Sequence, residues 1–70
     1  MDPQEYQYEY EYSGNFILYE GMAWPGAAKS DLKWLIKKYS NDGTNVTGSR
    51  VANGTPVFDK SWTKRTEYSY

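Results

Sequence analysis

The feature that most constrains this sequence is a run of tyrosines at every second position near its start. The rings belong to Tyr6, Tyr8, Tyr10 and Tyr12. Successive side chains of a β-strand point to opposite faces, so an extended backbone places these rings on one side and the intervening Gln7, Glu9 and Glu11 on the other. No Val, Ile, Leu, Phe or Trp precedes Phe16, so the segment has little to bury by itself. We therefore interpret 1–13 as an N-terminal arm that becomes a strand when something covers its tyrosines.

The remainder, 14–70, is too small to hold a large core. A chain of 70 residues buries only about 60 % of its unfolded surface, which leaves a thin margin of stability. Small folds usually add disulfides or a metal, but this sequence has no Cys and no His. The same absence removes thiol and imidazole chemistry. We expect no enzyme activity, no cofactor and no metal, and we expect stabilisation by contact with other chains.

Charge is distributed unevenly along the sequence. Residues 1–20 carry five acids and no Lys or Arg, a charge of −5, while residues 21–70 carry eight bases and four acids, a charge of +4. The arm is therefore expected to dock on the basic face of its own domain or of a neighbouring copy. The predicted interface residues are the four rings, the acids Glu9 and Glu11, and the receiving groups Lys33, Lys37, Lys64 and Arg65.

Turn signals divide 14–70 into short strands. Ser13-Gly14-Asn15 ends the arm, 15–22 is typical of a strand, and Pro25-Gly26 predicts a turn. Residues 31–39 fit a helix or a strand, but the hairpin signal Asn41-Asp42-Gly43 favours a strand. Asn53-Gly54 predicts a second tight turn. The pattern predicts an all-β domain, a small antiparallel sheet or barrel-like fold with an extended arm.

Two expectations concern the C-terminal third. Residues 58–62 fit one helical turn in which Phe58 and Trp62 touch, and these rings with Trp34 are expected to form the core. An exposed platform that stacks bases or sugars is the alternative for these rings. The terminal RTEYSY alternates tyrosines as the arm does.

Residues 19–70 resemble a group of small virion structural proteins of tailed bacteriophages. The resemblance lies in Tyr19-Glu20-Gly21, Ala23, Pro25-Gly26, Trp34-Leu35-Ile36-Lys37-Lys38, Asp42-Gly43, Ala52-Asn53-Gly54, Phe58-Asp59, Trp62, Arg65 and Tyr68-Ser69-Tyr70. It implies an all-β, non-enzymatic component of the phage head, neck or tail with a terminal aromatic strand. It also implies assembly in the host cytoplasm and residence in the virion.

The predicted partners are copies of the chain itself or other virion proteins, joined by strand addition and arm-to-face contacts. Two alternatives remain: a small β-barrel that binds single-stranded nucleic acid, and an adhesive module that stacks sugars on Trp24 or Trp62. Nucleic acid is disfavoured because the basic excess is opposed by the acidic arm. No run of 18 apolar residues is present, so we expect no membrane span.

Overall fold

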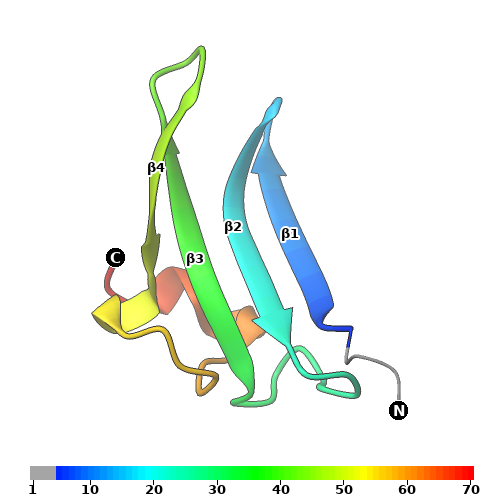
Figure 1. The fold of residues 1–70 in the computed structure, drawn as a ribbon. Coiled ribbons are helices and arrows are strands. Elements are labelled where there is room, and N and C mark those ends of the chain that lie inside the picture. Colours follow the sequence, from blue (N-terminus) through cyan, green and yellow to red (C-terminus); the bar gives the residue numbers. More distant parts are fainter. Residues whose placement is uncertain (1–4) are drawn as a thin grey trace.

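The computed structural model describes residues 5–70, which form one antiparallel sheet with a C-terminal segment packed on one face (Figure 1). The strands are β1 (Gln7–Ser13), β2 (Phe16–Ala23), β3 (Trp34–Asn41) and β4 (Val46–Val51). They lie side by side in chain order, so β1 and β4 are the two edges of an open sheet. Two short 3-10 helices follow, η1 (Ala52–Gly54) and η2 (Trp62–Glu67). The predicted all-β class and small antiparallel sheet are confirmed.

The segment predicted as an arm supplies the first edge strand. β1 pairs with β2 from Gln7 opposite Ala23 to Ser13 opposite Phe16. The connecting turn contains Gly14 at φ 60°, a backbone conformation that glycine adopts without steric cost. Residues 1–4, the beginning of the predicted arm, lie outside the described residues. Residues 7–13 and the domain predicted for 14–70 thus share one sheet.

The ambiguous segment 31–39 is mainly strand, because β3 begins at Trp34 and the helical alternative is wrong. The turn that joins β3 to β4 explains this outcome. The Asp42 carboxylate accepts backbone hydrogen bonds from Thr44 at 2.9 Å and Asn45 at 2.7 Å, which hold the pKa of Asp42 below its usual value. Gly43 adopts φ 92° in the same turn. Here the turn joins two antiparallel strands, as Asp-Gly turns commonly do.

The two faces of the sheet have different environments. We call the face that carries the core the inner face and the opposite one the outer face. The buried core consists of Tyr19, Ala23, Ala27, Trp34, Ile36, Ala52 and Trp62. Gly21 in the middle of β2 leaves room for the Trp62 ring, because a Cβ there would lie 2.6 Å from Trp62 Cε3. Trp34 and Trp62 are core residues as predicted, whereas the third predicted ring, Phe58, lies outside the buried core.

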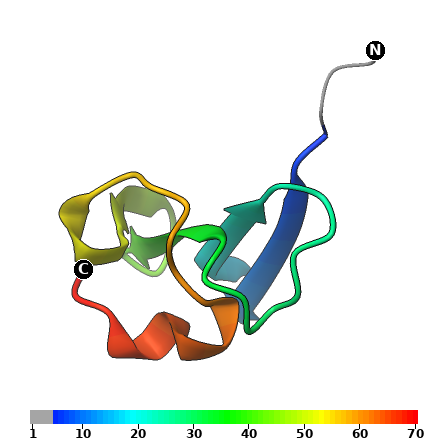
Figure 2. The same ribbon diagram turned by 90° about the horizontal axis from the view of Figure 1, so that it is seen from below.

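The C-terminal segment crosses the inner face as 3-10 turn and irregular backbone, so the predicted terminal strand is wrong (Figure 2). The predicted helical turn is also displaced, because it begins at Trp62 and Phe58 lies in a bend. Trp62 packs against Trp34, with ring centroids 6.2 Å apart. The terminal residues are held by mutual bonds: Asn53 N–H donates to the Ser69 carbonyl at 2.7 Å, and Ser69 N–H donates to Asn53 Oδ1 at 3.0 Å.

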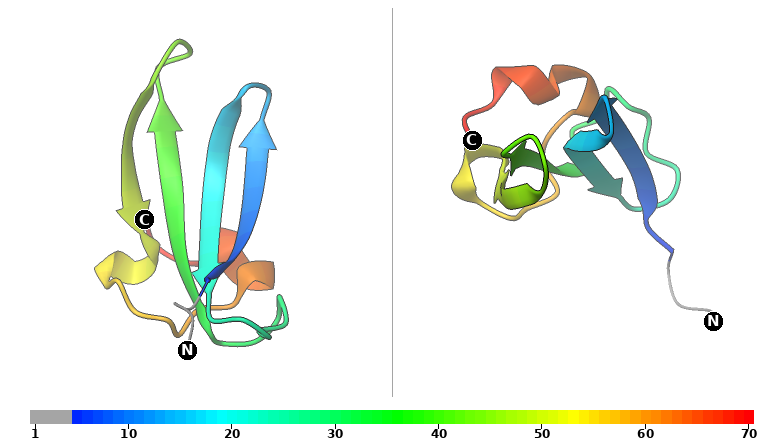
Figure 3. Two further views of the ribbon diagram at one scale, coloured as in Figure 1. Left: turned by 45° about the vertical axis from the view of Figure 1, so that its right-hand side comes forward. Right: turned by 90° about the horizontal axis from the view of Figure 1, so that it is seen from above.

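The two hairpins separate toward their tips, as the views in Figure 3 show. β2 and β3 pair only between Tyr19–Ala23 of β2 and Trp34–Lys38 of β3. Each hairpin also changes register near its tip, between Glu11 and Tyr12 in β1 and between Ser40 and Asn41 in β3. The regular sheet is therefore confined to the half that carries the core.

Candidate protein-interaction surfaces

A ladder of tyrosine rings lies on the outer face of the edge strand β1. Tyr8, Tyr10 and Tyr12, the tyrosine ladder, are 46, 46 and 61 % exposed. The ring centroids of Tyr8 and Tyr10 are 6.1 Å apart with planes 7° from parallel, and those of Tyr10 and Tyr12 are 6.3 Å apart. The alternation in the sequence predicts this common face. The rings support one another and leave much of their surface in water.

The fourth tyrosine of the sequence pattern belongs to a separate cluster. Tyr6 precedes β1 and packs against Trp24, which follows β2, at 4.8 Å between ring centroids. Phe58 stacks on Tyr6 at 5.9 Å, with planes 11° apart. Trp24 remains 46 % exposed in this cluster. The rings therefore lie at the end of the sheet where β1 begins and β2 ends.

The acids of β1 project to the inner face and bind cations of the same chain. Glu9 Oε1 lies 3.6 Å from Lys29 Nζ, and Glu11 Oε1 accepts a 2.8 Å hydrogen bond from Arg65 Nε. The Arg65 guanidinium also stacks on the Trp62 ring at 4.6 Å and donates to the Trp62 carbonyl at 3.1 Å. Lys29 was not among the predicted receiving groups, because nothing in the sequence places its loop beside β1.

The other predicted receiving groups do not reach these acids within residues 5–70. Lys37 lies opposite Glu20 on the outer face, and Lys33 and Lys64 are exposed. Of the four cations predicted from the sequence, only Arg65 binds an acid of β1 in the described structure.

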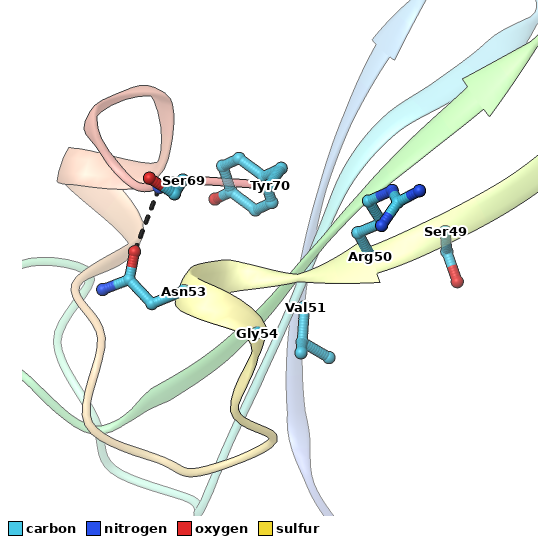
Figure 4. A pocket seen from close by; sticks show the side chains of 7 residues that line it. All are labelled: Ser49, Arg50, Val51, Asn53, Gly54, Ser69 and Tyr70. Atoms are coloured by element: carbon cyan, nitrogen blue, oxygen red, sulfur yellow. Dashed lines mark hydrogen bonds between the residues drawn. The ribbon is translucent and has the colours of Figure 1, made fainter.

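The opposite edge of the sheet borders an open groove of about 760 Å³, which we call the β4 groove (Figure 4). Its lining comes from β4, η1 and the C-terminal residues: Ser49, Arg50, Val51, Asn53, Gly54, Ser69 and Tyr70. A smaller hollow of about 160 Å³ shares Arg50 and Tyr70 and adds Lys38 and Ser40. No signal in the sequence indicated this groove, because it forms only when the chain end folds back beside β4.

Phenol groups near both edges keep their protons at neutral pH. Burial, followed by the hydrogen bond that Tyr39 donates to Glu20 Oε1 at 2.9 Å, raises the pKa of Tyr39 to about 12. Burial and then the neighbouring phenols of Tyr19 and Tyr68 raise the pKa of Tyr70 to about 12. Tyr10 also has a raised pKa, from desolvation and then the Glu20 charge. The Tyr39 and Tyr70 hydroxyls are hydrogen-bond donors in the structure, to Glu20 Oε1 and to the Arg65 carbonyl.

Within residues 5–70 the structure offers binding surfaces. No three His, Cys, Asp or Glu side chains of this range gather to hold a metal ion. Every buried side-chain nitrogen and oxygen in the same range has a hydrogen-bond partner. No helix of the described part is long and apolar enough to cross a membrane. The candidate surfaces are thus the β1 edge with its tyrosine ladder and the β4 groove.

Comparison with known proteins adds no relative: no protein-family model, curated protein or solved structure matches this chain.

Proposed function

We propose that this chain is a non-enzymatic structural subunit of a tailed-phage particle that joins its neighbours by strand addition at β1. The observation that best supports strand addition is the tyrosine ladder, which is exposed on the outer face of an edge strand. The phage setting is supported by the resemblance of residues 19–70 to small virion proteins. The resemblance is equally compatible with the head, the neck and the tail, and we propose that assembly takes place in the host cytoplasm.

An edge strand with exposed rings combines two sources of binding energy. The free backbone groups of β1 can pair with another strand, and tyrosine buries a large area with few rotatable bonds. Covering the exposed parts of the three rings removes on the order of 300 Å² from water, at roughly 200 Å² for each side chain. At about 25 cal/mol per Å² this contributes about 7 kcal/mol before the costs of association.

The structure shows contacts between acids and bases within one chain, where we expected such contacts between copies. Glu9 and Glu11 bind Lys29 and Arg65 of their own chain. These bonds fix the inner face of β1 on the C-terminal segment and leave the ladder directed outward. The proposal therefore assigns recognition to the β1 backbone and the ladder, and stability of the subunit to the acids.

A carbohydrate-binding module is the second candidate, favoured by the half-exposed Trp24 beside Tyr6 and Phe58. Trp62, the other predicted sugar platform, is 5 % exposed and presents no free ring face. Binding to single-stranded nucleic acid has less support. Lys37 and Lys38 are adjacent in β3 and project to opposite faces, and Lys60 is 7 % exposed, so these cations do not share one basic face.

The experiment replaces Tyr8, Tyr10 and Tyr12 with Thr, which keeps strand propensity and removes the rings. Deleting the whole segment would instead remove a strand from the sheet. Expressed during infection in place of the wild-type chain, the variant is expected to be depleted from purified particles. Leu32→Thr, at an apolar position that is 65 % exposed outside the sheet, is the matched control and is expected to incorporate normally.

Circular dichroism of the purified chains checks that the variant is folded. Normal incorporation of the folded ladder variant would contradict the role of the rings. Absence of the wild-type chain from particles would contradict the phage assignment. Binding to a glycan array that is lost when Trp24 is replaced would then support the second candidate.

A further inference from the structure

We infer that the β4 groove receives strand β1 of a second copy of this chain, so that copies join head to tail in one continuous antiparallel sheet. This inference rests on the proposed function, strand addition at β1, and names the partner. Three properties of the described residues support it: the direction of the edge strands, the shape of the groove and the charges on each edge.

The strand directions permit head-to-tail pairing without rotating one copy. Four strands alternate in direction across the sheet, so β1 and β4 run in opposite directions at opposite edges. A second copy placed beside the first in the same orientation therefore brings its β1 antiparallel to β4. The inner faces of both copies then lie on the same side. Antiparallel pairing is the more stable arrangement per residue.

The β4 groove runs along the backbone of the free edge. Ser49, Arg50 and Val51 are consecutive residues of β4, and their side chains alternate between the two faces. All three line the groove, so the edge backbone itself forms one wall, and residues of η1 and the chain end form the other (Figure 4). This shape suits an extended segment that pairs with the edge.

The side chains of the two edges are complementary in the registers that set Arg50 opposite Glu9 or Glu11. Ser49 and Val51 lie on the outer face, since Val51 is opposite Lys37 and Ser49 is opposite Tyr39. They would meet the tyrosine ladder of the incoming β1. The phenols that become buried need polar partners, and the Ser49 hydroxyl lines the groove on the same outer face.

Charge selects this arrangement over a symmetric one. Arg50 projects to the inner face opposite Lys38, and within residues 5–70 neither cation is paired with a carboxylate. The inner-face positions of β1 before its register shift are Gln7, Glu9 and Glu11. In the registers that bring Ser49 and Val51 to the tyrosine ladder, Arg50 lies opposite Glu9 or Glu11, each of which also binds a cation of its own chain. Pairing β1 with β1 would instead set glutamates against glutamates, which is destabilising.

The test uses two variants that each block one edge. The first, Ser49→Glu with Arg50→Glu, places acids on both faces of β4 and leaves β1 intact. The second, Tyr8→Lys with Tyr10→Lys, places cations on the ladder and leaves β4 intact. The control Ser30→Glu with Lys33→Glu makes the same charge change as the first variant, at two exposed positions outside both edges. Tryptophan fluorescence and circular dichroism verify the fold of each.

Sedimentation equilibrium over a range of concentrations gives the masses. We expect wild type and the control to associate beyond a dimer, and each edge variant alone to associate at least about tenfold more weakly. An equimolar mixture of the two edge variants is expected to form a dimer that grows no further, because only one competent β1 and one competent β4 remain.

The inference is overturned if the β4 variant alone forms dimers as tightly as wild type does, which would indicate pairing of β1 with β1. It is also overturned if wild type associates but the mixture stays monomeric, or if wild type is a monomer at every concentration. In each of these cases, if incorporation into particles still depends on the ladder, the proposed function would stand. Strand β1 would then pair with a surface other than the β4 groove. The opposite outcome is also distinguishable. If wild type forms chains but the ladder variant enters particles normally, the head-to-tail pairing would stand and the proposed role of the ladder in particles would fail.

Discussion

Substituting Gly21 with Ala tests how closely the C-terminal segment packs on the sheet. Gly21 lies on the inner face of β2, and a Cβ there would be 2.6 Å from Trp62 Cε3, 2.9 Å from Trp62 Cζ3 and 3.0 Å from Trp34 Cε3. Carbon atoms in favourable contact are separated by roughly 3.5–4.0 Å, so the Trp62 ring must withdraw by about 1 Å. Trp34 is fully buried and Trp62 is 5 % exposed, so neither ring has open space to enter.

The expected cost follows from this overpacking. Extra methyl groups in a well-packed core destabilise by about 1–3 kcal/mol, and the absence of relief for both rings places Gly21→Ala near the upper end. For a domain of this length a loss of about 2–3 kcal/mol lowers the Tm by roughly 10–20 °C. Urea unfolding followed by tryptophan fluorescence measures the free energy, and thermal circular dichroism measures the Tm.

Gly48→Ala is the matched control. Gly48 also lies in a strand, but no atom lies within 4 Å of the Cβ it would gain. Its unfolding free energy is expected to stay the same or to rise by about 0.5 kcal/mol, because Ala restricts the unfolded chain more than Gly does. The two substitutions therefore differ in steric contact and share the same chemistry.

A second background sharpens the test. In a Trp62→Phe chain the smaller ring gives the new methyl room, so Gly21→Ala is expected to cost at least about 1 kcal/mol less than in wild type. A cost within about 0.5 kcal/mol of zero in wild type, or an equal cost in both backgrounds, would refute the packing of Trp62 against β2 described above.

Two further predictions concern side chains at the edges of the core. Arg65→Ala is expected to lower the unfolding free energy by about 1–3 kcal/mol, because it removes the bond to Glu11 and the stacking on the buried indole; Arg65→Lys is expected to recover less than half of this. Urea titration measures the unfolding free energy of both variants, and Lys64→Ala, at an exposed position, serves as the neutral comparison. Full recovery of the unfolding free energy in Arg65→Lys would contradict the stacking. Since the folded pKa values of Tyr39 and Tyr70 are raised to about 12 from 10.0, the protonated phenols stabilise the fold fully below pH 10, and stability is lost as the pH rises from 10 toward 12. Near-ultraviolet titration is expected to show two late phenols that disappear in the double Phe variant, and ionisation of all eight tyrosines together near pH 10 would contradict this.

Local patterns in the sequence predicted the elements that local chemistry determines. The alternation of Tyr8, Tyr10 and Tyr12 predicted a common face because the period of a strand is two residues. The turn at Asp42 and Gly43 settled an ambiguous segment in favour of β3, since a carboxylate that accepts two backbone N–H groups makes a tight turn stable wherever it occurs.

Features that depend on distant residues were missed. Tyr68 and Tyr70 alternate as the β1 tyrosines do, yet this end of the chain forms no strand. The Tyr68 hydroxyl instead accepts a hydrogen bond from the Ser61 N–H at 2.8 Å, and the Tyr70 hydroxyl donates to the Arg65 carbonyl at 2.6 Å. These bonds curl the segment on itself, and period alone cannot distinguish that outcome from a strand.

The choice of ion-pair partners was missed for the same reason. The charge imbalance predicted that the acids of β1 would meet cations, but it could not say which. Lys29 reaches Glu9 only because the loop from Trp24 returns beside β1, where Gln7 donates to the Ala27 carbonyl at 2.7 Å and accepts from Gly26 N–H at 3.1 Å. The β4 groove likewise exists only after Asn53 has bound the chain end.

The register changes near both hairpin tips limit how far any added strand can extend. The extra residue is Leu18 of β2 in one hairpin and Thr47 of β4 in the other, so regular pairing holds only up to Glu11 of the β1 edge and from Gly48 onward in the β4 edge. Only short stretches of each border remain straight enough to be joined. These two irregularities shorten the stretch over which an added strand can pair at either border, and they set no limit on how many copies can join head to tail.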